Sequence, residues 1–476
     1  MSLAPDSPDH LMTGGAATTV QDQVPAVLDT ASRAALEYLA GIPARRVSPH
    51  PDALAAIAGF DIELPDGPRN PVDVVTQLHR LGSPATTASA GGRFFGLVVG
   101  ATLPAALGAR MLTSAWDQVV FNDLTSPVAC ALERITARWI TDVLGLPGES
   151  HVSYVTGATM GNFTALAAAR DALLRRAGHD ALNAGLWSAP RLRVVTGDEA
   201  HVTVVKSLTL LGFGREEIVR VPTDDQGRVR PDALPDLDER TILILQAGNV
   251  NSGAIDPFDQ VVPRARRAGA WVHVDGAFGL WAAASPALRG AMAGIEDADS
   301  WVTDGHKWLN TPYDCGLAIV RDAQALHQVM TTQAPYLAAG TTAAPKDMGP
   351  EFSRSARAVE VWAALYSLGR QGLADLIDRT CAHARAFADG LRGLGYTVLN
   401  DVTLNQVVAA PPGDPNAAGR IAARVQESGE CWFGPTIWRG RPAIRISVSS
   451  HATTTDDVRR SLEAIAAATE AEQLKP

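Results

Sequence analysis

The chain has 476 residues, of which 46% are hydrophobic and 19% are charged, a composition typical of a globular protein with two or three domains. Its formal net charge of −10 argues against a nucleic-acid partner, because phosphate backbones attract clustered lysine and arginine. No apolar run is long enough to cross a bilayer, and the N-terminal stretch lacks the basic start and apolar core of a secretory signal. The four scattered cysteines form no CxxC pair, so we expect a cytoplasmic protein with reduced thiols and no membrane partner.

The N-terminal part, residues 1–92, is expected to be a disordered tail followed by helices that prolines interrupt. The segment VPAVLDTASRAALEYLAGI has the apolar spacing of a helix that packs one face on another surface. We expect a large α/β domain over residues 93–375 and a small C-terminal α+β domain over residues 376–476.

The large domain is predicted from a change of pattern that begins at His151. Short apolar runs rich in β-branched residues alternate there with helical stretches rich in alanine, leucine and arginine. This alternation is typical of a mainly parallel sheet covered by helices on both faces. A loop over residues 333–352 and two long helices, near residues 355–368 and 373–394, are expected next. The strand candidates are HVSYVT, RLRVVTGD, TILILQAG, AWVHVD, DSWVTD and GLAIVRD.

Polar or glycine-rich residues follow nearly every one of these strands. Ligands of open α/β sheets bind beyond the carboxyl ends of the strands, so the five polar ends are expected to share one edge. Ordinary turn chemistry explains any single one of these loops. Five together, with a lysine, an aspartate and a histidine among them, favour a ligand site. The five ends are GATMGN, TGDEAH, QAGNVNSG, Asp275 and DGHK.

The segment GATMGN opens an alanine-rich helix that ends at Gly178. Its small residues, Ala158 among them, leave backbone N–H groups accessible, and Thr159 adds a hydroxyl donor, so this helix start could bind a phosphate. The segment has neither a GxGxxG nor a GxxxxGK[ST] pattern, so a dinucleotide or nucleoside triphosphate has no fingerprint here. A capped helix after a turn explains the segment equally well.

Lys307 stands between an imidazole and an indole in a segment poor in charge, DGHKWLNTPYDCG. Asp275 ends an earlier strand, AWVHVD, one helix and one strand before Lys307, so the two residues are expected at the ends of neighbouring strands. His201 follows a third strand. Asp275 could instead be a helix cap, and His201 could be a structural histidine. A phosphate site, a carboxylate, a lysine and a flat imidazole around one cleft meet the needs of pyridoxal 5'-phosphate (PLP). The lysine would form an imine with its aldehyde, and the carboxylate would keep its pyridine nitrogen protonated.

The motifs DGHKW, HVDGAFG, DEAH, SPVACALERITARW and GRFFGLVVGATLPA resemble the group II PLP-dependent amino-acid decarboxylases. The resemblance covers roughly residues 93–370. It implies fold type I, an aminotransferase-like α/β fold, and a lyase of amino-acid metabolism that decarboxylates an L-amino acid through a Lys307 imine. It also implies a homodimer with active sites at the subunit interface, in which the N-terminal helices embrace the partner. No metal is expected.

Carried over residue by residue, the resemblance makes Lys307, His201 and Asp275 the catalytic residues. Asp275 would pair with the pyridine nitrogen, Ala277 would lie against the ring and His201 would stack on it. Phe94 and Phe95 match an aromatic pair that lines the substrate pocket of the family. Residues expected around the phosphate are Ala158, Thr159, Asn249, Asp304 and His306.

The chain departs from the family pattern in the loop after the lysine. Family decarboxylases carry a tyrosine there that helps to protonate Cα. The loop of this chain is shorter and has no tyrosine after Tyr336, which matches a structural position. The proton donor is therefore open among His201, a lysine such as Lys346 and a bound water.

Arg445 lies in a predicted strand of the C-terminal domain. Aminotransferases of this fold use an arginine of that domain to bind the substrate carboxylate, and a structural ion pair is the equal alternative.

The sequence supports three hypotheses for the function, of which decarboxylation is the leading one. Another Cα chemistry on the same scaffold, such as transamination, retro-aldol cleavage or oxidative deamination, is the second, and the missing tyrosine supports it. A non-catalytic or nucleotide-binding α/β protein is the third.

Overall fold

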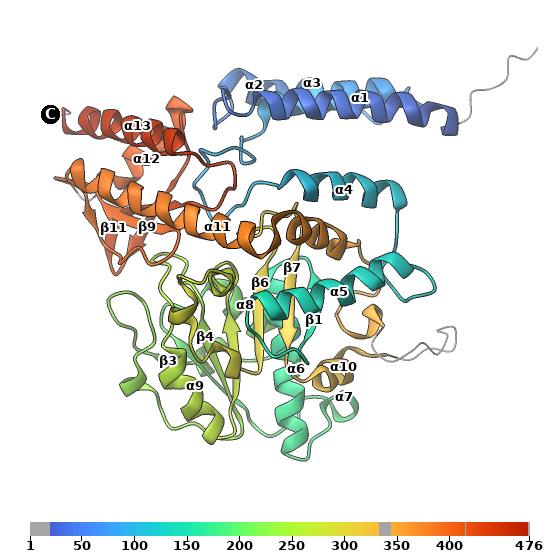
Figure 1. The fold of residues 1–476 in the computed structure, drawn as a ribbon, viewed down its shortest axis with the longest axis vertical. Coiled ribbons are helices and arrows are strands. Elements are labelled where there is room, and N and C mark those ends of the chain that lie inside the picture. Colours follow the sequence, from blue (N-terminus) through green and yellow to red (C-terminus); the bar gives the residue numbers. More distant parts are fainter. Residues whose placement is uncertain (1–19, 333–343, 415, 475–476) are drawn as a thin grey trace, which may run out of the picture. The chain divides into compact units, whose positions relative to one another are not determined.

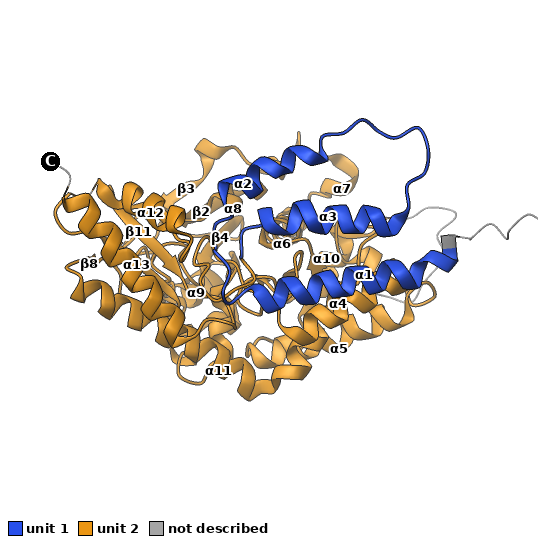
Figure 2. Cartoon of the chain, turned by 90° about the horizontal axis from the view of Figure 1, so that it is seen from above, with its two compact units in different colours: residues 1–88 blue, residues 89–476 orange. Residues whose placement is uncertain are grey.

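The computed structural model describes residues 20–332, 344–414 and 416–474. The chain divides into two compact units, Met1–Ala88 and Ser89–Pro476, which are coloured separately in Figure 2. None of the helices in the described ranges is long and apolar enough to span a membrane.

The first unit is helical. Its helices are α1 (Val20–Gly41), α2 (Pro51–Ala55) and α3 (Pro71–Ala85). Pro71 begins α3, where its missing N–H costs no helical hydrogen bond, and the side chain of Asn70 caps the helix by accepting from the backbone N–H of Val72. Helices α1 and α3 pack together, and the hydroxyl groups of Tyr38 and Thr86 lie 2.9 Å apart.

A seven-stranded sheet forms the centre of the second unit (Figure 1). Its strands are β1 (His151–Val155), β2 (Arg193–Gly197), β3 (Val219–Val221), β4 (Thr241–Gln246), β5 (Trp271–Asp275), β6 (Ser300–Asp304) and β7 (Gly316–Val320). They lie in the order β1-β7-β6-β5-β4-β2-β3. Strands β3, β2, β4, β5 and β6 are parallel, while β7 is antiparallel to both β1 and β6. The predicted mainly parallel α/β fold is therefore confirmed, and β1 runs in the same direction as β6.

The strands are buried on both faces, as their uninterrupted apolar sequences predict. In β4, Ile242 and Ile244 belong to one hydrophobic cluster, whereas Leu243 and Leu245 belong to another on the opposite face. The first cluster includes side chains of α6, α8 and α10, and the second includes those of α5, α9 and α11. The helices of the second unit up to residue 393 are α4 (Pro104–Trp116), α5 (Pro127–Val143), α6 (Ala158–Arg176), α7 (Ala181–Ala184), α8 (Val202–Leu210), α9 (Phe258–Arg267), α10 (Ala323–Met330) and α11 (Arg357–Gly393).

The two helices expected after residue 352 meet within α11. Gly369 separates them with a non-helical backbone at φ +61°, a conformation that glycine adopts without the steric penalty of a Cβ atom.

The C-terminal part forms a second, four-stranded antiparallel sheet in the order β10-β11-β9-β8. Its elements are β8 (Thr397–Val398), β9 (Gln406–Ala410), α12 (Ala417–Ser428), β10 (Gly434–Trp438), β11 (Arg441–Ser447) and α13 (Thr455–Gln473). The sequence patterns missed β3 and β10. The first has only three residues, and the second leaves most of its residues partly or fully exposed, so neither shows a buried-strand signal.

Candidate active site

The sheet brings the predicted site residues to one edge. Because β1, β6, β5, β4 and β2 run in the same direction, their carboxyl ends meet there. Asp275 ends β5, Asp304 ends β6, and the backbone N–H of Asp304 donates to the carbonyl of Ala277 at 2.8 Å. The loop after β4 joins them, since the N–H of Ala247 donates to the carbonyl of Asp275 at 2.9 Å.

Lys307 lies just beyond β6 in a sheltered position. Its side chain is 22% exposed, and its Nζ lies 3.1 Å from Oδ2 of Asp304, which is 2% exposed. Nε2 of His306 lies 3.5 Å from the same oxygen, and burial lowers the pKa of this imidazole. The other oxygen of Asp304 is buried without a hydrogen-bond partner among the described residues. The lysine therefore has one carboxylate partner instead of a solvated surface.

Asn310 fixes the turn that carries Lys307. It is fully buried and has a left-handed backbone, with φ +59°. Its Nδ2 donates to the carbonyls of Trp308 and Ser449 at 2.9 Å, while its Oδ1 accepts from the N–H of His451 at 2.7 Å. These bonds tie the lysine turn to the C-terminal domain. The motif DGHKWLNTPYDCG contained Asn310, but nothing in the sequence marked this role.

Gly100 packs directly against the same turn. A Cβ atom at this position would lie 1.9 Å from the carbonyl oxygen of Lys307, a backbone atom that cannot move freely. We expect Gly100→Ala to lower the free energy of unfolding by about 1–3 kcal/mol and to weaken cofactor binding. Thermal unfolding and a cofactor titration measure both effects.

Gly108→Ala is the matched control, because a Cβ atom there, within α4, meets nothing within 4 Å. It should be neutral or stabilise by about 0.5–1 kcal/mol. Equal behaviour of the two variants would contradict the close packing of Gly100 on the lysine turn.

The carboxylate of Asp275 is buried, 4% exposed, and receives two N–H donors. The backbone N–H of Ala277 donates to Oδ1 at 3.1 Å, and Nδ2 of Asn162 donates to Oδ2 at 3.3 Å. Asp275 is therefore held by hydrogen bonds in a fixed orientation at the edge of the sheet. The helix-cap alternative is not observed, since the 3-10 helix that follows, Gly279–Ala284, has no side-chain cap.

Sequence reasoning missed the buried residues behind Asp275. Nε2 of His273 lies 2.8 Å from Oδ1 of Asn162, and its Nδ1 lies 2.9 Å from Oγ of Ser300. One signal was available, because residues two apart on a strand share a face, which places His273 and Asp275 on the same side of β5. Asn162 lies one turn into α6, the helix that covers this face.

The buried His273 predicts a pH effect on stability. Burial lowers its pKa from 6.5 to about 4, with the Asp275 carboxylate opposing the shift. Below about pH 6.5 the unfolded chain binds a proton that the folded chain does not bind until about pH 4. Over this range the free energy of unfolding should fall by about 3 kcal/mol on this account. His273→Gln should remove that part of the fall, and unfolding curves of the two proteins between pH 7.5 and 4 measure it. A constant difference at every pH would contradict the prediction.

His201 is the N-cap of α8. Its Nδ1 lies 2.6 Å from Oγ1 of Thr203 and accepts the backbone N–H of the same residue at 3.3 Å. Burial lowers the pKa of His201 most strongly; Asp275 opposes this shift, whereas Lys307 and Arg445 add to it. His201 therefore has the structural role of a helix cap. The charges of Asp275, Lys307 and Arg445 also influence the protonation of its ring.

The start of α6 suits an anionic group. Its N-cap is Gly157, and no side chain of the described residues caps the first turn, so the N–H groups near Ala158 and Thr159 have no partner within the helix. A Cβ atom on Gly157 would lie 3.2 Å from Cε1 of His306, which shows how closely the helix start approaches the lysine turn. A free helix start, a sheltered amine and a buried carboxylate fit the phosphate, aldehyde and pyridine nitrogen of PLP.

Asn249 is buried in the loop after β4, where its Oδ1 accepts from the backbone N–H groups of Asn251 and Ser252 at 2.9 and 3.2 Å. Arg445, on β11, donates to the carbonyl of Val250 in the same loop at 3.2 Å. Arg445 forms this hydrogen bond and no ion pair with the residues that the structure describes, and burial lowers the pKa of its guanidinium group.

The aromatic pair lies against the small sheet. The ring of Phe94 stacks on Trp432 at 5.0 Å between centroids. Phe95 is 1% exposed and packs edge-on against Phe387 in the core of the C-terminal domain. Core packing therefore accounts for the aromatic ring of Phe95.

Of the residues considered as proton donors, Lys346 is buried and paired with Asp347, at 2.6 Å from Nζ to Oδ1. Tyr336 lies outside the described residues. Tyr313, which sequence reasoning did not single out, stacks on His306 with 4.3 Å between centroids, and burial raises its pKa to about 12.

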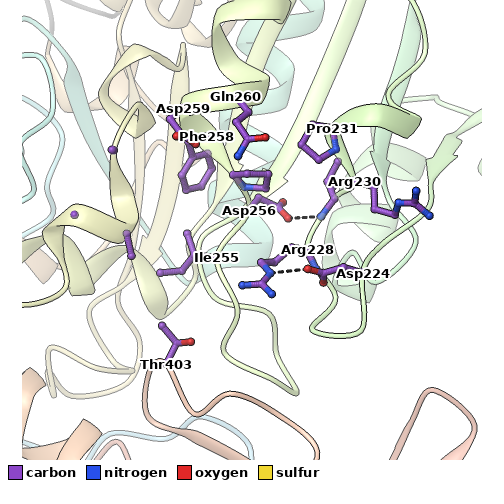
Figure 3. Close-up of a pocket in the computed structure, with 15 residues that line it drawn as sticks. Asp224, Arg228, Arg230, Pro231, Ile255, Asp256, Phe258, Asp259, Gln260 and Thr403 are labelled. Carbon is purple, nitrogen blue, oxygen red and sulfur yellow. Dashed lines mark hydrogen bonds and ion pairs between the residues drawn. The ribbon is translucent and has the colours of Figure 1, made fainter.

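A pocket of about 500 Å³ lies elsewhere in the second unit (Figure 3). Both oxygens of Asp256 in its wall accept backbone N–H groups, from Val229 and Gln246, so this carboxylate joins a loop to the end of β4. None of the predicted site residues lines this pocket.

The fold and the arrangement of these residues fit a PLP-dependent enzyme of fold type I. The family described as "Pyridoxal-dependent decarboxylase conserved domain" matches residues 52–408, and the chain belongs to this family. Tryptophan decarboxylase 1 of Oryza sativa subsp. japonica is 30% identical over 420 residues, which cover 80% of this chain and 81% of that protein. An L-2,4-diaminobutyrate decarboxylase of Rhizobium meliloti is 29% identical over 380 residues, 76% of this chain and 74% of that protein.

Solved structures agree with the family. The crystal structure of Oryza sativa TDC with PLP and tryptamine has a TM-score of 0.86 and 26% identity, and the match covers 95% of this chain and 99% of that chain. Mouse CSAD in apo form, at 21% identity and a TM-score of 0.84 over 94% of this chain and 98% of that chain, shows the fold alone. The chain is thus an amino-acid decarboxylase whose cofactor is PLP.

Proposed function

We propose that this enzyme decarboxylates an L-amino acid with Lys307 as the residue that joins the cofactor aldehyde. The main support is the position of Lys307, whose sheltered amine lies 3.1 Å from Asp304 at the edge of the sheet that Asp275 also reaches. The comparisons do not favour the alternative Cα chemistries that the missing loop tyrosine suggested.

When bound, PLP supplies an electron-accepting ring for the pair of electrons that remains as carbon dioxide leaves. In this proposal the carboxylate of Asp275 binds the protonated ring nitrogen, and Ala277 lies against the ring. The first turn of α6, with Ala158 and Thr159, donates N–H and O–H groups to the phosphate. Asn249, Asp304 and His306 surround the same end of the cofactor.

His201 is proposed to stack on the cofactor ring. With Nδ1 accepting from Thr203, its Nε2 carries the proton of the neutral ring and can donate it toward the substrate. We retain His201 and a bound water as candidate donors of the proton to Cα. The ion pair of Lys346 with Asp347 makes that lysine a poor donor.

For substrate binding we propose Arg445 and Phe94, whereas the burial of Phe95 favours a packing role. Arg445 reaches the loop after β4 and influences His201, so it lies near the same edge of the sheet. Phe94 and the name of the Oryza relative support an aromatic amino acid as the first substrate to test.

The test is a panel of L-tryptophan, L-tyrosine, L-2,4-diaminobutyrate and L-glutamate, incubated with PLP-loaded enzyme. Carbon dioxide and the amine should appear in equal amounts for one or more of them. Formation of a keto acid or an aldehyde in place of the amine would reject decarboxylation.

We further propose a homodimer in which the N-terminal helices contact the partner. Leu28 and Leu36 of α1 are 55% and 67% exposed, which leaves apolar surface available for such a contact. The cytoplasmic location stays a prediction.

A further inference from the structure

A continuous hydrogen-bonded chain of buried side chains lies behind Asp275. It runs from Trp271 through Ser300, His273 and Asn162 to the carboxylate. Exposure along the chain is between 0% and 4%.

The donors and acceptors fix the direction of this chain. Nε1 of Trp271 can only donate, and it lies 2.9 Å from Oγ of Ser300. The hydroxyl proton of Ser300 is then free to be donated to Nδ1 of His273, at 2.9 Å. His273 therefore carries its proton on Nε2 and donates it to Oδ1 of Asn162.

The reverse arrangement fails at Asp275. If His273 donated to Ser300, its Nε2 would have to accept from the amide of Asn162. The amide oxygen of Asn162 would then face Oδ2 of the carboxylate, and two acceptors at about 3.3 Å would repel each other. One tautomer of His273 and one orientation of Asn162 thus satisfy all the groups.

The backbone supports the same geometry. His273 and Ser300 are register partners in the parallel pair of β5 and β6. Asn162 projects from α6 onto the face of β5 that carries Trp271, His273 and Asp275, and α6 also carries the proposed phosphate site at its start. The chain therefore couples the carboxylate to the helix that would bind the opposite end of the cofactor.

We infer that Asn162 and His273 are positioning residues that hold the Asp275 carboxylate in the orientation in which it would bind the cofactor's ring nitrogen. This inference rests on the proposed role of Asp275. It predicts that the hydrogen-bonding ability of the two side chains, and not their volume alone, determines how well Asp275 interacts with that nitrogen.

The test uses enzyme loaded with PLP that carries ¹⁵N in its ring. Asn162→Leu and His273→Phe keep most of the volume but break the chain. The solid-state ¹⁵N spectrum should show a protonated ring nitrogen in the unaltered enzyme and a smaller protonated fraction in both variants. The dissociation constant of PLP should rise, and kcat should fall, by about tenfold or more, as for other residues that orient a functional group.

His273→Gln is the conservative variant, because its amide can still donate to Asn162. If hydrogen bonding is what matters, His273→Gln should preserve the signal of the protonated ring nitrogen better than His273→Phe does. Simple packing predicts the opposite order, since Phe resembles the imidazole ring more closely, and that order would overturn the inference. Tyr396→Phe, which removes one buried bond to Thr469 at 2.7 Å in the C-terminal core, should leave the spectrum unchanged.

If an apolar variant does not fold, Ser300→Ala tests the inference instead. This variant removes one hydroxyl group and leaves the side chains of His273, Asn162 and Asp275 in place. A partial loss of the protonated signal supports the inference, and an unchanged signal overturns it. The proposed function fails separately, if the unaltered, PLP-loaded enzyme releases no carbon dioxide from any amino acid.

Discussion

Lys307→Ala is expected to reduce decarboxylation by at least about 10³-fold. The variant lacks the only amine that the structure places beside Asp304 among the described residues, so the substrate must react with a cofactor that is no longer attached. The variant should also lack the visible absorption that an imine between lysine and PLP produces. Steady-state kinetics and an absorption spectrum measure the two effects.

Lys206→Ala is the matched control, since Lys206 lies exposed on α8. It should retain the activity and the spectrum of the unaltered enzyme. If Lys307→Ala kept both as well, Lys307 would not be the attachment residue.

Asp275→Asn is expected to lower kcat by about 10²- to 10³-fold. An amide of nearly the same shape keeps the bond from the N–H of Ala277 but has no negative charge to stabilise a protonated ring nitrogen. The free energy of unfolding should change much less than kcat. Single-turnover release of carbon dioxide measures the chemical step directly.

Asp299→Asn provides the comparison for a partly buried carboxylate of the same sheet. Asp299 precedes β6 at the opposite edge and accepts the backbone N–H of Val272 at 2.7 Å. Asp299→Asn should lower the free energy of unfolding and leave the rate of the chemical step unchanged. Similar kcat values for the two variants would show that Asp275 has no special role.

The sequence alone predicted the large sheet and placed the candidate site residues at one edge of it. The strands are buried on both faces and so appear as continuous apolar runs, and polar residues follow directly at their ends, as at Asp275 and Asp304. Strand β3 could not be predicted, because three residues between turns give no periodic pattern.

The supporting residues were harder to predict for a physical reason. Asn162, His273 and Asn310 act through side-chain hydrogen bonds to residues that are distant in the chain. Asn162 and His273, for example, are 111 positions apart. A polar residue in an apolar segment signals only that some partner exists. The identity of the partner depends on the packing of α6 against β5, which the local pattern does not specify.

The central claim is that Lys307 holds the cofactor. The most direct measurement is reduction of the PLP-loaded enzyme with borohydride, followed by proteolysis and mass spectrometry of the labelled peptide. The chain has only four lysines, at positions 206, 307, 346 and 475, so the labelled position can be assigned without ambiguity. We predict a pyridoxyl group on Lys307 alone; a label on another lysine, or no label in an enzyme that releases carbon dioxide, would contradict the claim.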